Sequence, residues 1–181
     1  MLELITARGR SAQMTLPKID FAEYPQELRS GTADGSVTYE LRTDRYAFHH
    51  NEPDEPPSGN AEIVLREDDR LIEIFSADTA PAMTKASLGP VYSKVPSGGL
   101  AVPTGLVFVR FRSGVSAAGK KRNIELAGYG IARLIEYAPE AVWLKHRSDD
   151  IAAALTHIPA LQNIRDIENV EPQMLMQRAN K

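Results

Sequence analysis

Cysteine is absent from this sequence of 181 residues. Without cysteine the chain forms no disulfide, carries no thiolate nucleophile and holds no cysteine-ligated zinc, so its folded state depends on burial and hydrogen bonds. Long apolar runs are missing too, because no stretch reaches the roughly 18 apolar residues of a membrane-spanning helix. The first residues carry an early acid and too short an apolar stretch for a signal peptide. These absences predict a soluble, cytoplasmic protein with no membrane partner.

An excess of positive charge is also lacking. The chain has 21 Lys and Arg against 24 Asp and Glu, which gives a net charge of −3. Binding to nucleic acid without sequence preference depends on a basic surface that faces the phosphates. We therefore expect no nucleic-acid partner.

Proline is scarce in the second part of the chain, where only three of the 12 prolines follow residue 103. The stretch from Pro81 to Pro103 contains several chain breakers and little hydrophobic periodicity, which is typical of an extended connection. We place a domain boundary at Gly98, between a β-rich module of unknown role (residues 1–98) and a second domain (residues 99–181). Residues 51–60 are polar and proline-rich, and they predict an exposed, mobile loop.

The first region is dominated by strand signals. Val37–Leu41 alternates apolar and polar residues, and Arg45–His49 is expected to return beside it. Ala61–Arg66 and Arg70–Phe75 flank a short acidic turn and predict a hairpin with one buried face. A helical turn is expected at Tyr24–Arg29. We assign this region no chemistry.

The second region alternates strand and helix signals. The predicted elements are a strand at Gly105–Arg112, a helix at Ala117–Ala127 capped by Ser116, strands at Ile131–Tyr137 and Ala141–His146, a helix that opens at Ser148-Asp149-Asp150, and a last extended segment to Pro172. Trp143 lies on a predicted central strand and is expected to pack in the core. The order β-α-β-β-α-β is that of the ferredoxin-like fold. The predicted fold class is therefore α+β, with an N-terminal β-rich module followed by a ferredoxin-like domain.

Residues from about 105 onward resemble a known family. They run from Leu106-Val-Phe-Val-Arg-Phe-Arg-Ser-Gly-Val-Ser-Ala-Ala through Gly128-Tyr-Gly-Ile-Ala-Arg-Leu-Ile-Glu-Tyr and Ile158-Pro159 to Val170-Glu171-Pro172-Gln173. In order and spacing, these segments resemble the N-terminal propeptides, or I9-type inhibitors, of subtilisin-like serine proteases. The resemblance covers residues 105–181 and leaves residues 1–100 without a counterpart.

The resemblance implies an inhibitor and intramolecular chaperone of a subtilisin-like serine protease, encoded in the same precursor or as a separate chain. Such propeptides hold the outer face of their sheet against two protease helices, and an acid of the Val-Glu-Pro motif caps helix N-termini there. A carboxylate at a helix start gains charge-assisted hydrogen bonds from unpaired N–H groups. The chain after the motif would lie in the substrate cleft as an added strand. The implied protease-binding residues are Glu171, Gln173, Met174, Leu175, Met176, Gln177, Arg178, Ala179, Asn180 and Lys181.

Glu168 is the alternative helix-capping acid. Family members usually have a shorter connection between the proline of the second helix and the acidic motif, whereas Pro159 and Glu171 are 12 positions apart. Either the connection is longer in this chain, or Ile167-Glu168 is the equivalent motif. We prefer Glu171 because Pro172 follows it, as in many family members. Both choices place the tail in the protease cleft.

Catalytic and metal-binding motifs are missing. The sequence has no His-Gly-Thr-His type motif and no Gly-Thr-Ser followed by Met-Ala, so we expect no catalytic residue, no enzyme activity and no cofactor. His49 and His50 stand near several acids, but adjacent strand residues point to opposite faces, so we expect no metal site. Two other functions stay open: a non-enzymatic ferredoxin-like module for binding or oligomerisation, and a structural subunit of an assembly.

Overall fold

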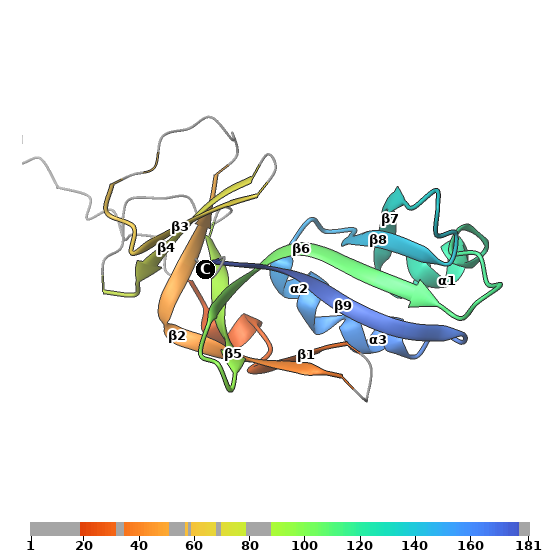
Figure 1. The fold of residues 1–181 in the computed structure, drawn as a ribbon, viewed down its shortest axis with the longest axis horizontal. Helices are drawn as coiled ribbons and strands as arrows, with labels where there is room; N and C mark the ends of the chain where they lie inside the picture. The colour runs from red at the N-terminus through yellow and green to blue at the C-terminus, as the bar shows by residue number, and fades with distance from the viewer. Residues whose placement is uncertain are drawn as a thin grey trace, which may run out of the picture.

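The computed structural model describes residues 19–31, 35–50, 57, 59–67, 70–78 and 88–177. Strands make up 51% of these residues and helices 17%. Nine strands join in one sheet, and every pairing between them is antiparallel. Figure 1 shows β6 and β9 linking the two halves of this sheet.

The first half of the described chain forms one side of the sheet. Its elements are the 3-10 helix η1 (Phe21–Glu23) and the strands β1 (Glu27–Ser30), β2 (Val37–His49), β3 (Ile63–Glu67), β4 (Arg70–Ser76) and β5 (Leu88–Val95). The long strand β2 is central, because β1 pairs with its beginning, β4 with its end and β5 with most of its length. β3 pairs with β4 and ends this side of the sheet.

The second half begins with β6 (Leu100–Phe111). It continues with the 3-10 helix η3 (Ala118–Lys120), α1 (Lys121–Leu126), β7 (Tyr129–Leu134), β8 (Ala141–His146), α2 (Ile151–Thr156), α3 (Ile158–Gln162) and β9 (Ile167–Met176). β6 pairs with β5 near its start and with β8 and β9 further along. The strand order in this half is β9-β6-β8-β7.

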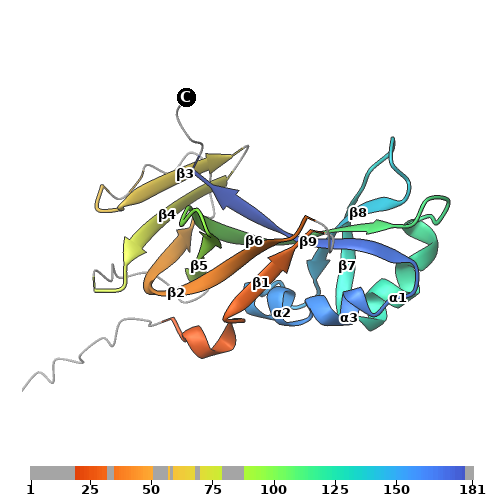
Figure 2. The same ribbon diagram turned by 60° about the horizontal axis from the view of Figure 1, so that its bottom comes forward.

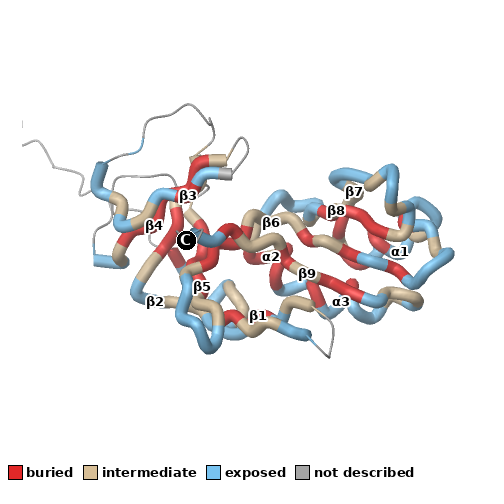
Figure 3. The backbone as a smooth tube through the Cα atoms, in the orientation of Figure 1, coloured by how far each residue is buried: buried red, intermediate tan, exposed pale blue. Residues whose placement is uncertain are grey.

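The three α-helices lie together on one face of the β9-β6-β8-β7 sheet (Figure 2). Successive strand residues point to opposite faces, so buried and more exposed positions alternate along residues 106–111 of β6. Figure 3 shows where the buried residues of the sheet lie. The inward residues pack against the helices in the largest core, which includes Val107, Val109, Val142, Leu144 and Val170 from the strands and Ile124, Leu155, Ile158 and Leu161 from the helices. None of the described helices lies on the opposite face of this sheet, and we call it the helix-free face.

A second core shows how the sheet curls. It contains Ala47, Leu65, Ile72, Ile74, Val91, Val102 and Leu175, which come from β2, β3, β4, β5, β6 and β9. Because six strands surround one cluster, β3 at one end of the sheet returns toward the end of β9, and the two strands contact each other. The sheet therefore curls so that β3 (residues 63–67) lies close to the end of β9 (residues 174–176).

The predicted α+β fold class is wrong, because the protein has a β-rich fold. The element order expected after residue 105 occurs, but its helices are only five or six residues long. β6 begins at Leu100 and continues the antiparallel pairing of β5, so the strands on both sides of Gly98 join one sheet. The boundary at Gly98 stays a prediction, although Leu28, Tyr39 and Tyr92 from before it belong to the largest core.

Three local expectations need correction. The helical turn expected at Tyr24–Arg29 is wrong, because the second half of that stretch belongs to β1, with Leu28 buried opposite Tyr39. The two short strands expected within residues 37–49 form one strand, β2. Its pairing with β5 has an irregular register between Arg42 and Tyr46, where the polar residues lie. The expected connection before Pro103 contains β5. Residues 51–56 and 58 of the expected loop lie outside the described residues.

The N-cap of α2 is Asp150 rather than Ser148. The Asp150 carboxylate accepts a hydrogen bond from Ala153 N at 2.7 Å, whereas Ser148 Oγ lies 2.7 Å from His146 Nδ1. We expect Asp150→Ala to lower the free energy of unfolding by about 0.5–2 kcal/mol, because the first turn of the helix loses its acceptor. Urea denaturation measures this change. Ser148→Ala is the control, and an equal loss in both variants would contradict the assignment of the cap.

Candidate functional site

A row of four side chains crosses the helix-free face. Glu171 of β9 pairs with Phe108 of β6, Phe108 pairs with Trp143 of β8, and Trp143 pairs with Arg133 of β7. Residues directly opposite each other in antiparallel strands project from the same face. The sequence places these residues up to 63 positions apart, and the sheet brings them together.

Phe108 and Trp143 form an aromatic pair at the centre of this row. Their ring centroids are 5.3 Å apart with an interplanar angle of 61°, an edge-to-face arrangement. Both residues are only partly buried. The expectation that Trp143 packs in the core is therefore wrong, because its neighbours Val142 and Leu144 take the inward positions. A partly exposed aromatic pair of this kind is typical of protein interfaces.

The Glu171 carboxylate is fixed beside the aromatic pair. Asn169 Nδ2 donates a hydrogen bond to Glu171 Oε1 at 2.6 Å, and Asn169 is itself only 8% exposed. No hydrogen bond to Glu171 Oε2 occurs within the described residues. Burial, and after it the negative charge of Glu171, raises the pKa of Tyr39. The site thus presents a held carboxylate with one oxygen open to an external donor.

Glu168, the alternative capping acid, is engaged differently. Its Oε2 lies 3.0 Å from Arg110 Nε, and both side chains are about half exposed. Each acid thus has one oxygen engaged by a neighbouring side chain, and the preference for Glu171 over Glu168 stays a prediction.

The residues that follow Glu171 belong largely to the protein's own sheet. Gln173 Oε1 accepts hydrogen bonds from Thr104 Oγ1 at 2.7 Å and from Arg70 Nη1 at 3.4 Å. Met174, Leu175 and Met176 pair with residues 101–103 of β6. Leu175 is 5% exposed and sits in the second core. These residues form the end of β9 rather than a peptide that trails away from the body.

Gln177 follows the end of β9, and Arg178, Ala179, Asn180 and Lys181 lie outside the described residues. A segment able to enter a protease cleft would therefore begin at Gln177, three residues later than Met174, where the sequence interpretation placed it, because β6 offers Met174–Met176 a pairing partner. The protease-binding role of residues 173–181 stays a prediction. No feature of the sequence predicted the pairing of β9 with β6 at Met174–Met176, because the paired residues lie far apart in the chain.

His49 and His50 occupy different surroundings. His50 Nε2 lies 2.8 Å from the fully buried Glu73, whereas His49 Nε2 is buried without a hydrogen-bond partner. Burial, and after it the positive charge of Arg70, lowers the pKa of His49 to about 4. Within the described residues, no group of three or more His, Asp or Glu side chains is arranged to hold a metal ion. Sequence reasoning missed the buried Glu73, because its strand pattern does not reveal the contact with His50.

Searches against protein-family models, curated proteins and solved structures find no match for the chain. The likeness to protease propeptides therefore rests on the sequence motifs alone. None of the described helices combines the length and the apolar character needed to cross a membrane.

Proposed function

We propose that this protein binds a subtilisin-like serine protease through the helix-free face and acts as its propeptide-like inhibitor and intramolecular chaperone. The observation that carries the proposal is the position of Glu171, a held carboxylate with one open oxygen, directly beside the Phe108–Trp143 pair. The protease is part of the same precursor or a separate chain. A cytoplasmic location belongs to the proposal on the sequence argument alone.

The two parts of the helix-free face supply different contributions to binding. Phe108 and Trp143 offer apolar area with few rotatable bonds, which packs against a partner at a low cost in side-chain entropy. Glu171 would orient the partner, because its second carboxylate oxygen accepts hydrogen bonds best from the unpaired N–H groups at a helix start.

The proposal separates docking from cleft blockage. Docking requires only the helix-free face, which the sheet holds in place. Blockage requires an extended segment that pairs with the edge of a protease strand, and that segment begins at Gln177. In this proposal the end of β9 is the fixed point that precedes the inhibitory segment.

Inhibition constants against a panel of subtilisin-like proteases test this proposal. We expect the wild-type chain to inhibit at least one of them, and Glu171→Gln to raise the inhibition constant about 10-fold or more, because a hydrogen bond to a charged group contributes about 1.5–3 kcal/mol. Glu168→Gln is the matched control and should change the constant about 2-fold or less, because an exposed ion pair contributes little.

The panel also distinguishes the alternative functions. Inhibition of no protease, or equal effects of the two substitutions, would contradict the proposal. A stable symmetric oligomer that none of the proteases disturbs would instead support a module for oligomerisation or assembly. Sedimentation of the chain with and without each catalytically inactive protease shows whether the chain forms an oligomer and whether it binds the protease.

A further inference from the structure

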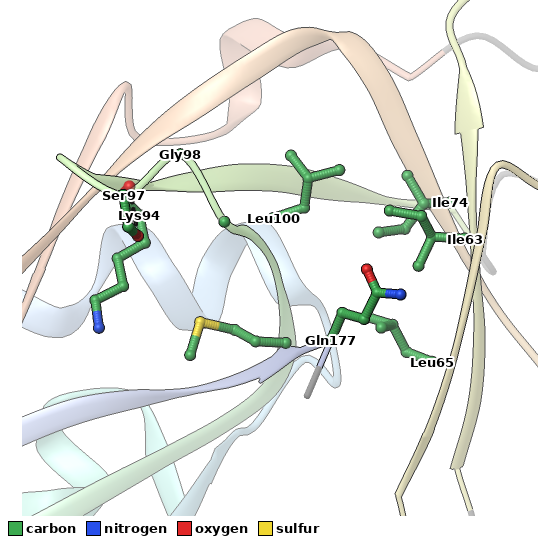
Figure 4. Close-up of a pocket in the computed structure, with 10 residues that line it drawn as sticks. Ile63, Leu65, Ile74, Lys94, Ser97, Gly98, Leu100 and Gln177 are labelled. Atoms are coloured by element: carbon green, nitrogen blue, oxygen red, sulfur yellow. Dashed lines mark hydrogen bonds between the residues drawn. The ribbon is translucent and has the colours of Figure 1, made fainter. Parts of the chain in front are cut away.

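A groove of about 630 Å³ lies between β3, the end of β9 and the turn that joins β5 to β6. This volume falls within the range of roughly 300–1,000 Å³ that is usual for small-molecule sites. Five of its ten lining residues carry apolar side chains, namely Ile63, Leu65, Ile74, Leu100 and Met176. Figure 4 shows Lys94 and Ser97 at one end of the groove and Ile63, Ile74 and Leu65 at the other, with Leu100 between them. Figure 4 places the Gln177 side chain between these two ends, so the groove has an apolar end, a polar end at Lys94 and one amide between them.

Lys94 is the one charged residue among the described residues that line this groove. The other lysines of the described chain each have a carboxylate nearby: Lys120 at 2.7 Å, Lys121 at 3.9 Å and Lys145 at 2.6 Å. Lys94 makes no such ion pair within the same residues, although it is partly buried. A lysine ammonium that has no counter-charge nearby offers a positive charge and N–H donors to an anion.

We propose that this groove binds an amphiphilic monocarboxylate, with an aliphatic chain along the apolar walls and the carboxylate at the Lys94 ammonium. Charge complementarity fixes the polar end, and burial of the chain against Ile63, Leu65 and Leu100 supplies most of the affinity. The site lies outside the helix-free face and does not depend on the function proposed for that face.

The walls of the groove favour an aliphatic chain over an extended peptide. A peptide carries an N–H and a C=O group at every residue, and each needs a partner when it is buried. Polar side chains among the described lining residues are limited to Lys94, Ser97 and Gln177. An aliphatic chain needs no such partners along its length.

Isothermal titration of the full chain with sodium decanoate and with decanol tests this proposal. Wild type should bind both probes. Lys94→Gln should weaken decanoate binding about 10-fold or more while leaving decanol binding unchanged, because only the carboxylate contacts the ammonium. Lys121→Gln removes an exposed lysine elsewhere and should bind both probes as wild type does.

Three results would overturn the proposal. The first is the absence of decanoate binding below its aggregation threshold. The second is equal decanoate affinity in wild type and Lys94→Gln, with circular dichroism showing that both are folded. The third is binding of the peptide acetyl-Leu-Leu-Leu in the absence of decanoate binding, which would identify a peptide groove instead.

Discussion

Leu175→Ala is expected to lower the free energy of unfolding by about 2–5 kcal/mol, the usual cost of truncating a leucine in a well-packed core. Leu175 is 5% exposed and packs in the second core with residues such as Val102, its partner on β6. The substitution would remove apolar contacts from several strands at once. A leucine in a trailing inhibitory peptide would show no such loss.

Met176→Ala is the matched control for this prediction. Met176 is the next residue of β9 but is 41% exposed, so its truncation should cost about 1 kcal/mol or less. Urea denaturation followed by circular dichroism measures both variants. Similar losses in the two variants, or no loss in either, would show that residues 174–176 do not form the end of β9 in solution.

His49 is expected to make the protein less stable in mild acid by about 3 kcal/mol. Its ring nitrogen Nε2 is buried without a hydrogen-bond partner, and its pKa falls from 6.5 to about 4 in the folded state. Between these two values the unfolded chain binds a proton at this residue and the folded chain does not. The stabilising contribution is therefore complete above pH 6.5 and is lost as the pH falls toward about 4, because each pKa unit corresponds to about 1.36 kcal/mol.

His49→Leu tests this pH dependence. The free energy of unfolding is measured for both proteins from pH 7.5 to 4, and the difference is taken at each pH so that the other titrating groups cancel. The free energy of unfolding of wild type minus that of the variant should fall by about 3 kcal/mol as the pH is lowered across this range. Leucine also removes the unpartnered nitrogen, so the variant should lose little stability at neutral pH. Parallel stability curves would contradict the buried, neutral state of His49.

The parts of the fold that local patterns determine were predictable from the sequence. The predicted strand Ala141–His146 is confirmed, because the alternation that places Val142 and Leu144 inward is written in neighbouring residues. The hairpin of β3 and β4 is confirmed for the same reason. The strand β5 was not predicted, because it contains Gly89 and Pro90, two residue types that are rare in strands. Its pairing with β2 and β6 depends on residues elsewhere in the chain.

The fold class and the surroundings of the sites depend on such long-range pairings. The motif around Glu171 pointed to an acid, but its support by Asn169 and its position beside Phe108 follow from the register of β9 on β6. The groove at Lys94 joins residues of β3, the β5–β6 turn and β9, which have no common local pattern. Periodicity predicts which residues point inward, whereas the assembly of strands decides which surfaces they build.

The absence of cysteine allows a direct test of the binding face, because a single introduced thiol reports on its own surroundings. Arg133→Cys places a thiol on the exposed edge of the helix-free face, opposite Trp143, and Arg122→Cys places one on the exposed surface of α1. The rate of alkylation is measured for each variant with and without a saturating subtilisin-like protease whose catalytic serine has been replaced.

If the helix-free face binds the protease, alkylation of Arg133→Cys slows about 10-fold or more on addition of the protease, because interfaces exclude solvent and reagents from the side chains that they bury. Alkylation of Arg122→Cys should keep its rate. Protection of Arg122→Cys instead, or unchanged rates in both variants, would contradict binding through the helix-free face.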